Sequence, residues 1–209
     1  MSKCCAWAKR RGSSPVFAKL RRVHFTRRLS AWPYTHTLRG NGYMCLVVRK
    51  SPIAGFGVFT DAPISTGEVI HCLSGESISL LNCAARVILG RLSEDSPLAT
   101  GRFTYIQLDD FSVRFNHSSE PNAAMRGESE LFAHRDIAPG EEITYDYSLT
   151  VLPNPVTWFW RMPCNCGAES CRGVVKNIRQ IPFHRIEELT NAKALQDFVI
   201  AWVQRNIYA

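Results

Sequence analysis

The chain has 209 residues, 45% of them hydrophobic and 21% charged, which is enough for one domain with a sizeable core. It contains no apolar run near the roughly eighteen residues that a membrane-spanning helix requires, and no secretory signal precedes its eight cysteines. We therefore expect a soluble, intracellular protein without membrane contact. Its compartment and oligomeric state stay open.

The net charge of +7 is unevenly distributed. Residues 1–50 hold 12 Lys and Arg and no acid, whereas residues 51–209 hold the other 13 bases and all 18 acids, a net charge of −5. We predict that residues 1–42 form a disordered basic arm. Two alternatives stay open for it: a transit peptide, or a surface that binds nucleic acid. The acidic remainder suits a cationic substrate.

After residue 43 the sequence consists mostly of short apolar segments separated by turns. Strands are predicted at residues 44–49, 58–59, 69–72, 103–108, 111–115, 130–134 and 142–147. Residues 80–92 and 194–207 have apolar side chains at helical spacing. Many short strands, few helices and no strand–helix alternation indicate a mainly β fold and exclude a doubly wound parallel sheet.

Two glycine- and asparagine-containing segments are candidates for binding. Gly55-Phe56-Gly57 is typical of a hairpin turn, and also of a backbone that approaches a ligand closely. Residues 114–122 read RFNHSSEPN, a dense run of hydrogen-bonding side chains between two predicted strands. A plain capped loop is the simpler explanation of this second segment.

Two further segments carry tyrosines and cysteines. Residues 140–147 read GEEITYDY, and on a strand Tyr145 and Tyr147 lie on the same face. Two half-buried tyrosines in a sheet would explain that pattern as well. Cys164, Cys166 and Cys171 have the spacing of a metal site, although three packed thiols are a simpler alternative.

In this order the four segments resemble those of the SET-domain protein-lysine methyltransferases with a post-SET cysteine motif. The resemblance implies a fold of small curved β-sheets with a knot-like core, in which the 116–122 loop lies against the strand with both tyrosines. It implies a SET domain at residues 43–148, a post-SET motif at residues 160–176 and a C-terminal helical extension at residues 177–209. It also implies S-adenosylmethionine as methyl donor and a lysine-bearing protein, a histone or another basic protein, as substrate.

The resemblance also implies roles for single residues. Tyr147 corresponds to the catalytic tyrosine, and Tyr145 to a neighbouring position where tyrosine implies mono- or dimethylation. Lysine, with a pKa of about 10.4, is protonated at neutral pH, and an aromatic channel supplies the neutral amine that methyl transfer needs. The donor-binding positions correspond to Gly55, Phe56, Gly57, Tyr105, Asn116, His117 and Tyr147.

The sequence departs from the family pattern at Ser119, where the family has a fourth cysteine that completes a zinc site. Serine is a poor zinc ligand compared with a thiolate. We expect zinc at Cys164, Cys166 and Cys171, completed by water or by another side chain, with no zinc as the alternative. The outside candidates for the fourth ligand are Cys72, Cys83 and His184.

Two questions stay open on sequence alone. The missing cysteine favours a second hypothesis, a catalytically weak SET-like module that binds a peptide without turnover. Residues 149–162, which contain three large aromatic side chains, form either apolar cover for the core or one wall of a substrate or adenine pocket.

Overall fold

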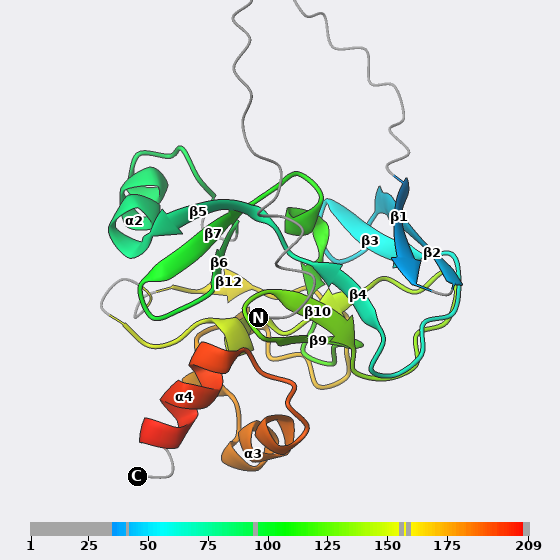
Figure 1. The fold of residues 1–209 in the computed structure, drawn as a ribbon. Helices are drawn as coiled ribbons and strands as arrows, with labels where there is room; N and C mark the ends of the chain where they lie inside the picture. Colours follow the sequence, from blue (N-terminus) through cyan, green and yellow to red (C-terminus); the bar gives the residue numbers. More distant parts are fainter. Residues whose placement is uncertain (1–34, 41, 94–95, 155–156, 158–159, 207–209) are drawn as a thin grey trace, which may run out of the picture.

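The computed structural model describes residues 35–40, 42–93, 96–154, 157 and 160–206. Three three-stranded sheets and two two-stranded pairs make up this part of the chain, with three α-helices at their edges (Figure 1). The predicted mainly β class with few helices is confirmed. Residues 1–34, most of the predicted basic arm, lie outside the described residues.

The first sheet is an antiparallel meander in the order β1-β2-β3. Its strands are β1 (Thr35–Gly40), β2 (Gly42–Lys50) and β3 (Phe56–Thr60). The strands predicted at residues 44–49 and 58–59 lie within β2 and β3. β1 pairs with β2 along its whole length, from Thr35 opposite Val47 to Gly40 opposite Gly42. The sheet therefore begins before residue 43, where we expected the domain to start.

The second sheet has the order β4-β10-β9 and is buried on both faces. Its strands are β4 (Val69–Cys72), β9 (Ala123–Arg126) and β10 (Glu130–Ala133). Because successive side chains of a strand point to opposite faces, Leu131 and Ala133 join the main core while Phe132 joins a second core. This sheet thus connects the two cores.

The third sheet, in the order β5-β7-β6, carries the helix α2. Its elements are β5 (Gly75–Ser79), α2 (Leu80–Ile88), β6 (Pro97–Ala99) and β7 (Thr104–Leu108). The Ser79 hydroxyl caps α2 by accepting from the Asn82 N–H. The helix was predicted to run to residue 92 but ends at Ile88, because Gly90 takes a left-handed φ of 64°.

Two short elements replace predicted strands near the middle of the chain. The strand predicted at residues 111–115 is wrong: Ser112–Arg114 is the 3-10 helix η1. Its cause is Asp109, whose carboxylate accepts from the N–H groups of Phe111 and Ser112 and so starts a turn. The strand predicted at residues 142–147 is reduced to β11 (Thr144–Tyr145), followed by the 3-10 helix η2 (Tyr147–Thr150).

The C-terminal part packs on the outer face of the second sheet, where Figure 1 shows α3 and α4 beside β9 and β10. The predicted helix at residues 194–207 is present as α4, with Val199 and Val203 fully buried, whereas α3 lies within the predicted helical extension without having been predicted as a separate helix. No described helix is long and apolar enough to cross a membrane. The elements of this part are β12 (Met162–Pro163), β13 (Val174–Val175), η3 (Ile178–Gln180), α3 (Phe183–Asn191) and α4 (Asp197–Asn206).

Candidate functional site

The site is built where two segments that are distant in sequence lie side by side. β8 (Asn116–His117) pairs in parallel with β11, with Asn116 opposite Thr144 and His117 opposite Tyr145. Asn122, at the end of the loop after β8, donates to the Glu142 carbonyl and accepts from the Thr144 N–H. The predicted juxtaposition of the 116–122 loop with the tyrosine strand is confirmed.

Asn116 connects the paired strands β8 and β11, which we call the crossing, to the turn at residues 55–57, which we call the glycine turn. Its side-chain amide lies 3.3 Å from the carbonyl oxygens of Ala54 and Phe56 and donates at 2.6 Å to the Glu142 carboxylate. Glu142 also accepts at 2.8 Å from the Ser51 hydroxyl. The turn, β8 and the segment before β11 therefore form one hydrogen-bonded unit.

Gly55 and Gly57 are required in this unit for different reasons. Gly55 has a φ of +47°, a backbone conformation that residues with a Cβ rarely adopt. A Cβ on Gly57 would lie 2.0 Å from the Glu142 carboxylate and 3.1 Å from the Asn116 amide. Between them Phe56 is 53% exposed, with the Arg114 guanidinium 5.2 Å from its ring centroid.

His117 is buried and electrically neutral. Its pKa is lowered from 6.5 to about 4, mainly by burial and to a smaller extent by the nearby Arg172, while the Asp146 carboxylate partly opposes the shift. Its Nδ1 accepts from the Tyr147 N–H at 3.2 Å, so the proton lies on Nε2. That buried Nε2 has no hydrogen-bond partner among the described residues.

The low pKa of His117 predicts a loss of stability in mild acid. The unfolded chain takes up the proton below pH 6.5 but the folded protein only near pH 4, so the free energy of unfolding falls as the pH drops through this window. Between pH 6.5 and 5 we expect His117 to lower the free energy of unfolding by about 2 kcal/mol. His117→Asn keeps an acceptor for the Tyr147 N–H and should show a shallower dependence in urea titrations. Equal pH dependence in both proteins would contradict this prediction.

Tyr145 and Tyr147 lie together at a cavity of about 440 Å³. Their ring centroids are 4.8 Å apart, and the Tyr147 hydroxyl donates to the Phe115 carbonyl at 2.7 Å. Tyr105 lines the same cavity, and burial raises the pKa of its phenol. The rest of the wall is largely apolar and includes Leu80, Ala84, Val87, Leu98, Val151 and Trp160.

The cavity answers the question about residues 149–162 in part. Thr150, Val151, Thr157 and Trp160 line it, so this segment forms one of its walls. Leu152 instead packs into the second core. The aromatic residues at positions 158 and 159 lie outside the described residues.

A buried ion pair joins the cysteine segment to the tyrosine segment. Both terminal nitrogens of Arg172 donate to Asp146, at 2.8 and 2.7 Å, and the Asp146 side chain is 6% exposed. Asp146 also accepts from the Ser148 N–H and so caps η2. Asp146 lies between the two tyrosines in sequence, so the pair fixes the backbone that carries them.

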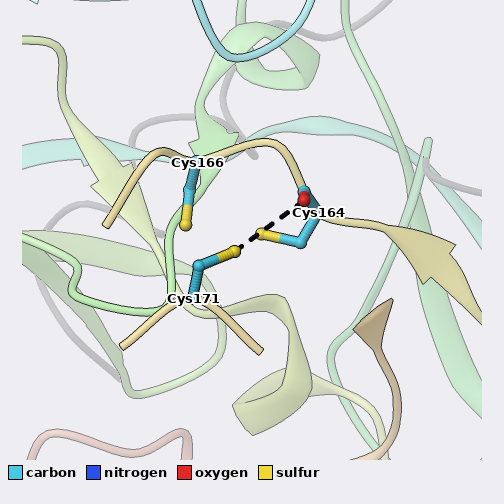
Figure 2. Close-up of side chains that lie close together, drawn as sticks. All are labelled: Cys164, Cys166 and Cys171. Atoms are coloured by element: carbon cyan, nitrogen blue, oxygen red, sulfur yellow. Dashed lines mark hydrogen bonds between the residues drawn. The ribbon is translucent and has the colours of Figure 1, made fainter. Parts of the chain in front are cut away.

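Cys164, Cys166 and Cys171 converge on one point, as Figure 2 shows. Their sulfurs all lie within 4.8 Å of one another, and tetrahedral zinc with bonds of about 2.3 Å places sulfurs roughly 3.8 Å apart. Burial raises the pKa of Cys164 to about 11. Burial acts in the same direction on Cys166, but N–H groups of Ser119 and Ala168 donate to its sulfur and lower its pKa to about 6.

Ser119 lies beside this cluster, at the position predicted for the missing ligand. Its N–H donates to the Cys166 sulfur, and its hydroxyl accepts from the Arg172 N–H at 3.2 Å. Within the described part of the chain, no further His, Cys or acidic side chain joins the three cysteines. Cys72, Cys83 and His184 are thus not fourth ligands in this structure. The three thiols fit zinc as an incomplete ligand set.

Ser119→Cys should complete the set. We expect the affinity for zinc to rise at least about tenfold, because a thiolate replaces a water or an open position. Competition against a chromophoric chelator would measure the change. Ser118→Cys, which adds a thiol one residue away, serves as the control and should leave the affinity unaltered. An equal rise in both variants, or in neither, would contradict the assignment of position 119.

Three residues of the site were not identified as functional from the sequence: Glu142, Asp146 and Arg172. Each lies within a motif that was recognised, but its partner is distant in the chain. Glu142 contacts Asn116 and Ser51, and Asp146 contacts Arg172. The only sequence signal for them is that a charged residue lies inside each of these motifs.

Comparison with known proteins identifies the class. Residues 55–148 match the family model of the SET domain, and the cysteine cluster fits a post-SET motif. Residues 55–148 of the chain therefore form a SET domain, and in this part the chain is similar to protein-lysine methyltransferases. Its fold resembles the crystal structure of the methyltransferase domain of human histone-lysine N-methyltransferase SETMAR, with a TM-score of 0.51 and 25% identity over 64% of this chain and 58% of that one.

Curated relatives are much longer proteins. Histone-lysine N-methyltransferase TRX1 of Oryza sativa subsp. japonica is 34% identical over 151 residues, which cover 64% of this chain and 14% of the relative. Human histone-lysine N-methyltransferase 2B is 35% identical over 144 residues, 60% of this chain and 5% of the relative. Drosophila melanogaster ash1 is 33% identical over 155 residues, 68% of this chain and 7% of the relative. The similarity thus concerns a small part of each relative.

Proposed function

We propose that this protein transfers a methyl group from S-adenosylmethionine to the side-chain amine of lysine in a protein substrate. One observation carries the proposal: Tyr145 and Tyr147 meet at an apolar cavity directly beside the Asn116–His117 crossing. The names of the relatives support a histone as the first substrate to test.

The glycine turn and β8 are the proposed site for the donor. The turn presents backbone groups at Gly55 and Gly57, and Phe56 exposes an aromatic ring next to them. The unpartnered, buried Nε2 of His117 supports a ligand at this place. When bound, the donor supplies an electrophilic methyl group on a sulfonium.

The tyrosine cavity is the proposed site for the lysine. Free lysine is almost wholly protonated at neutral pH, and the ammonium cannot attack a methyl group. Loss of hydration disfavours the charged form of any group, which is why burial raises the pKa of Tyr105. The same apolar surroundings lower the pKa of a lysine amine and release its lone pair. The protein needs no covalent step, only desolvation and alignment of amine, methyl and sulfur.

Tyr147 is the proposed catalytic residue. Its hydroxyl is held by the Phe115 carbonyl, one residue before Asn116, so it lies between the proposed donor and lysine sites. Weak C–H···O contacts to the hydroxyl and to nearby carbonyl oxygens would orient the methyl group.

Tyr145 is proposed to limit the number of methyl groups. Its ring is 4% exposed and packs against Tyr147, so a hydroxyl there takes space beside the amine. We therefore propose mono- or dimethyl-lysine as the main product. Tyr145→Phe should shift the product towards trimethyl-lysine at similar turnover, as measured by mass spectrometry of product peptides. Trimethyl-lysine as the main wild-type product would contradict the assignment.

Tritiated methyl transfer tests the proposed function. The full chain is incubated with labelled S-adenosylmethionine and either mixed histones or a cell lysate. A matched lysate with chemically dimethylated lysines is the control. The proposal predicts label in the first samples and its loss from the blocked lysate. Donor binding without any transfer would instead support the alternative, a catalytically weak SET-like module that binds a peptide, which the serine at position 119 favours.

A further inference from the structure

The tyrosine cavity is larger than the side chain it is proposed to receive. A volume of about 440 Å³ is in the range that holds a whole small-molecule ligand. The five heavy atoms of a lysine side chain occupy only a part of it. The remainder lies along α2, where Ala84, Val87 and Ile88 form the wall.

This wall continues onto the surface as exposed apolar side chains. Ile88 lines the cavity and is 83% exposed, and the neighbouring Leu89 is 64% exposed. Exposed apolar groups that adjoin a cavity mark a contact surface. The wall is also preformed, because Arg86 ties α2 to β5 and β7 through Glu76 and Gln107.

The described part of this wall has no charge with which to recognise a basic sequence. None of the described residues that line the cavity is charged. An arginine or lysine next to the target lysine would lose hydration there and gain no carboxylate partner. The net negative charge of residues 51–209, which suggests a basic substrate, is thus not found on the described residues that line the cavity.

We infer that the protein selects a lysine that has an apolar side chain directly beside it in the substrate chain. That side chain packs against Ala84, Val87 and Ile88 while the lysine reaches the tyrosines. The inference rests on the proposed function and narrows its substrate class from basic tails to lysines in apolar sequence contexts.

A peptide series tests the inference with the full chain. The peptides contain one lysine and differ only at the residue before or after it, which is Leu, Gln, Arg or Glu. At one of these two positions we expect kcat/KM for the Leu peptide to exceed that for Gln and Arg by roughly tenfold or more, the effect of burying one aliphatic side chain. Equal or better use of the Arg peptide, or labelling of lysate proteins but of no peptide, overturns the inference.

Two matched variants localise the effect on α2. Ile88→Glu should lower kcat/KM for the Leu peptide by about tenfold and raise it for the Arg peptide. Leu81→Glu changes an equally exposed residue outside the cavity wall and should leave both values unaltered. The same loss in both variants overturns the inference but not the proposed function. Absence of transfer to every peptide and to lysate protein overturns the proposed function itself.

Discussion

Replacing Tyr147 with phenylalanine is expected to lower kcat by about a hundredfold or more, because the hydroxyl aligns the reacting groups and misalignment of this kind is costly. The Tyr147 hydroxyl is fixed by the Phe115 carbonyl at 2.7 Å, so it is already positioned before substrate binds. KM for the lysine peptide should change less than kcat, since the apolar wall of the cavity is kept. Steady-state kinetics with the best peptide would measure both constants.

The stability of this variant provides its control. Loss of one hydrogen bond should reduce the free energy of unfolding by only about 1 kcal/mol, so the protein stays folded in the assay. The affinity for S-adenosylmethionine, measured by calorimetry, should also stay close to that of the wild type. A Tyr147→Phe protein with full activity would show that this hydroxyl is not catalytic.

Replacing Arg172 with alanine is expected to destabilise the protein by about 3–5 kcal/mol, the usual cost of leaving one member of a buried ion pair without its partner. Asp146 is 6% exposed and receives both terminal nitrogens of Arg172. Its charge would then lie uncompensated between Tyr145 and Tyr147. Urea unfolding would measure the loss, and activity should fall with it because the tyrosine backbone loses its anchor.

Two further variants separate the effect of losing the buried ion pair from the general effect of removing an arginine. Arg135 pairs with Glu141 at 2.8 Å, but both side chains are substantially exposed, at 54% and 33%, so Arg135→Ala should cost at most about 1 kcal/mol. Adding Asp146→Asn to Arg172→Ala removes the buried charge and should recover part of the lost stability. Equal losses from Arg172→Ala and Arg135→Ala would contradict a special role for the buried pair.

The sequence predicts those parts of the fold in which local pattern and tertiary packing agree. Residues 69–72 form β4 with the predicted bounds. Residues 80–88 form most of the predicted helix, in which Cys83 is buried and Leu80 and Val87 pack beside it. The tyrosine motif and the 116–122 loop are predicted to meet, and β8 and β11 do pair. That prediction came from the resemblance to a family, since parallel pairing of two-residue strands leaves no periodic signal.

The remaining features depend on contacts that no local pattern reveals. The carboxylate of Asp109 turns an apolar, strand-like segment into η1 by capping two N–H groups. Gly57 is fixed by the distant Glu142 as much as by any ligand, because a Cβ there would overlap that carboxylate. Arg172 follows a cysteine motif and gives no hint in sequence that it reaches Asp146. Long-range polar pairing therefore sets the geometry of the site.

The most direct test is one crystal structure of the full chain with S-adenosylhomocysteine and a lysine peptide bound together. We predict the cofactor product on the side of the glycine turn and Asn116, and the lysine amine in the cavity, with the sulfur and the amine facing each other across the Tyr147 hydroxyl. Two ligands bound in places that do not meet at Tyr147 would contradict the proposed reaction.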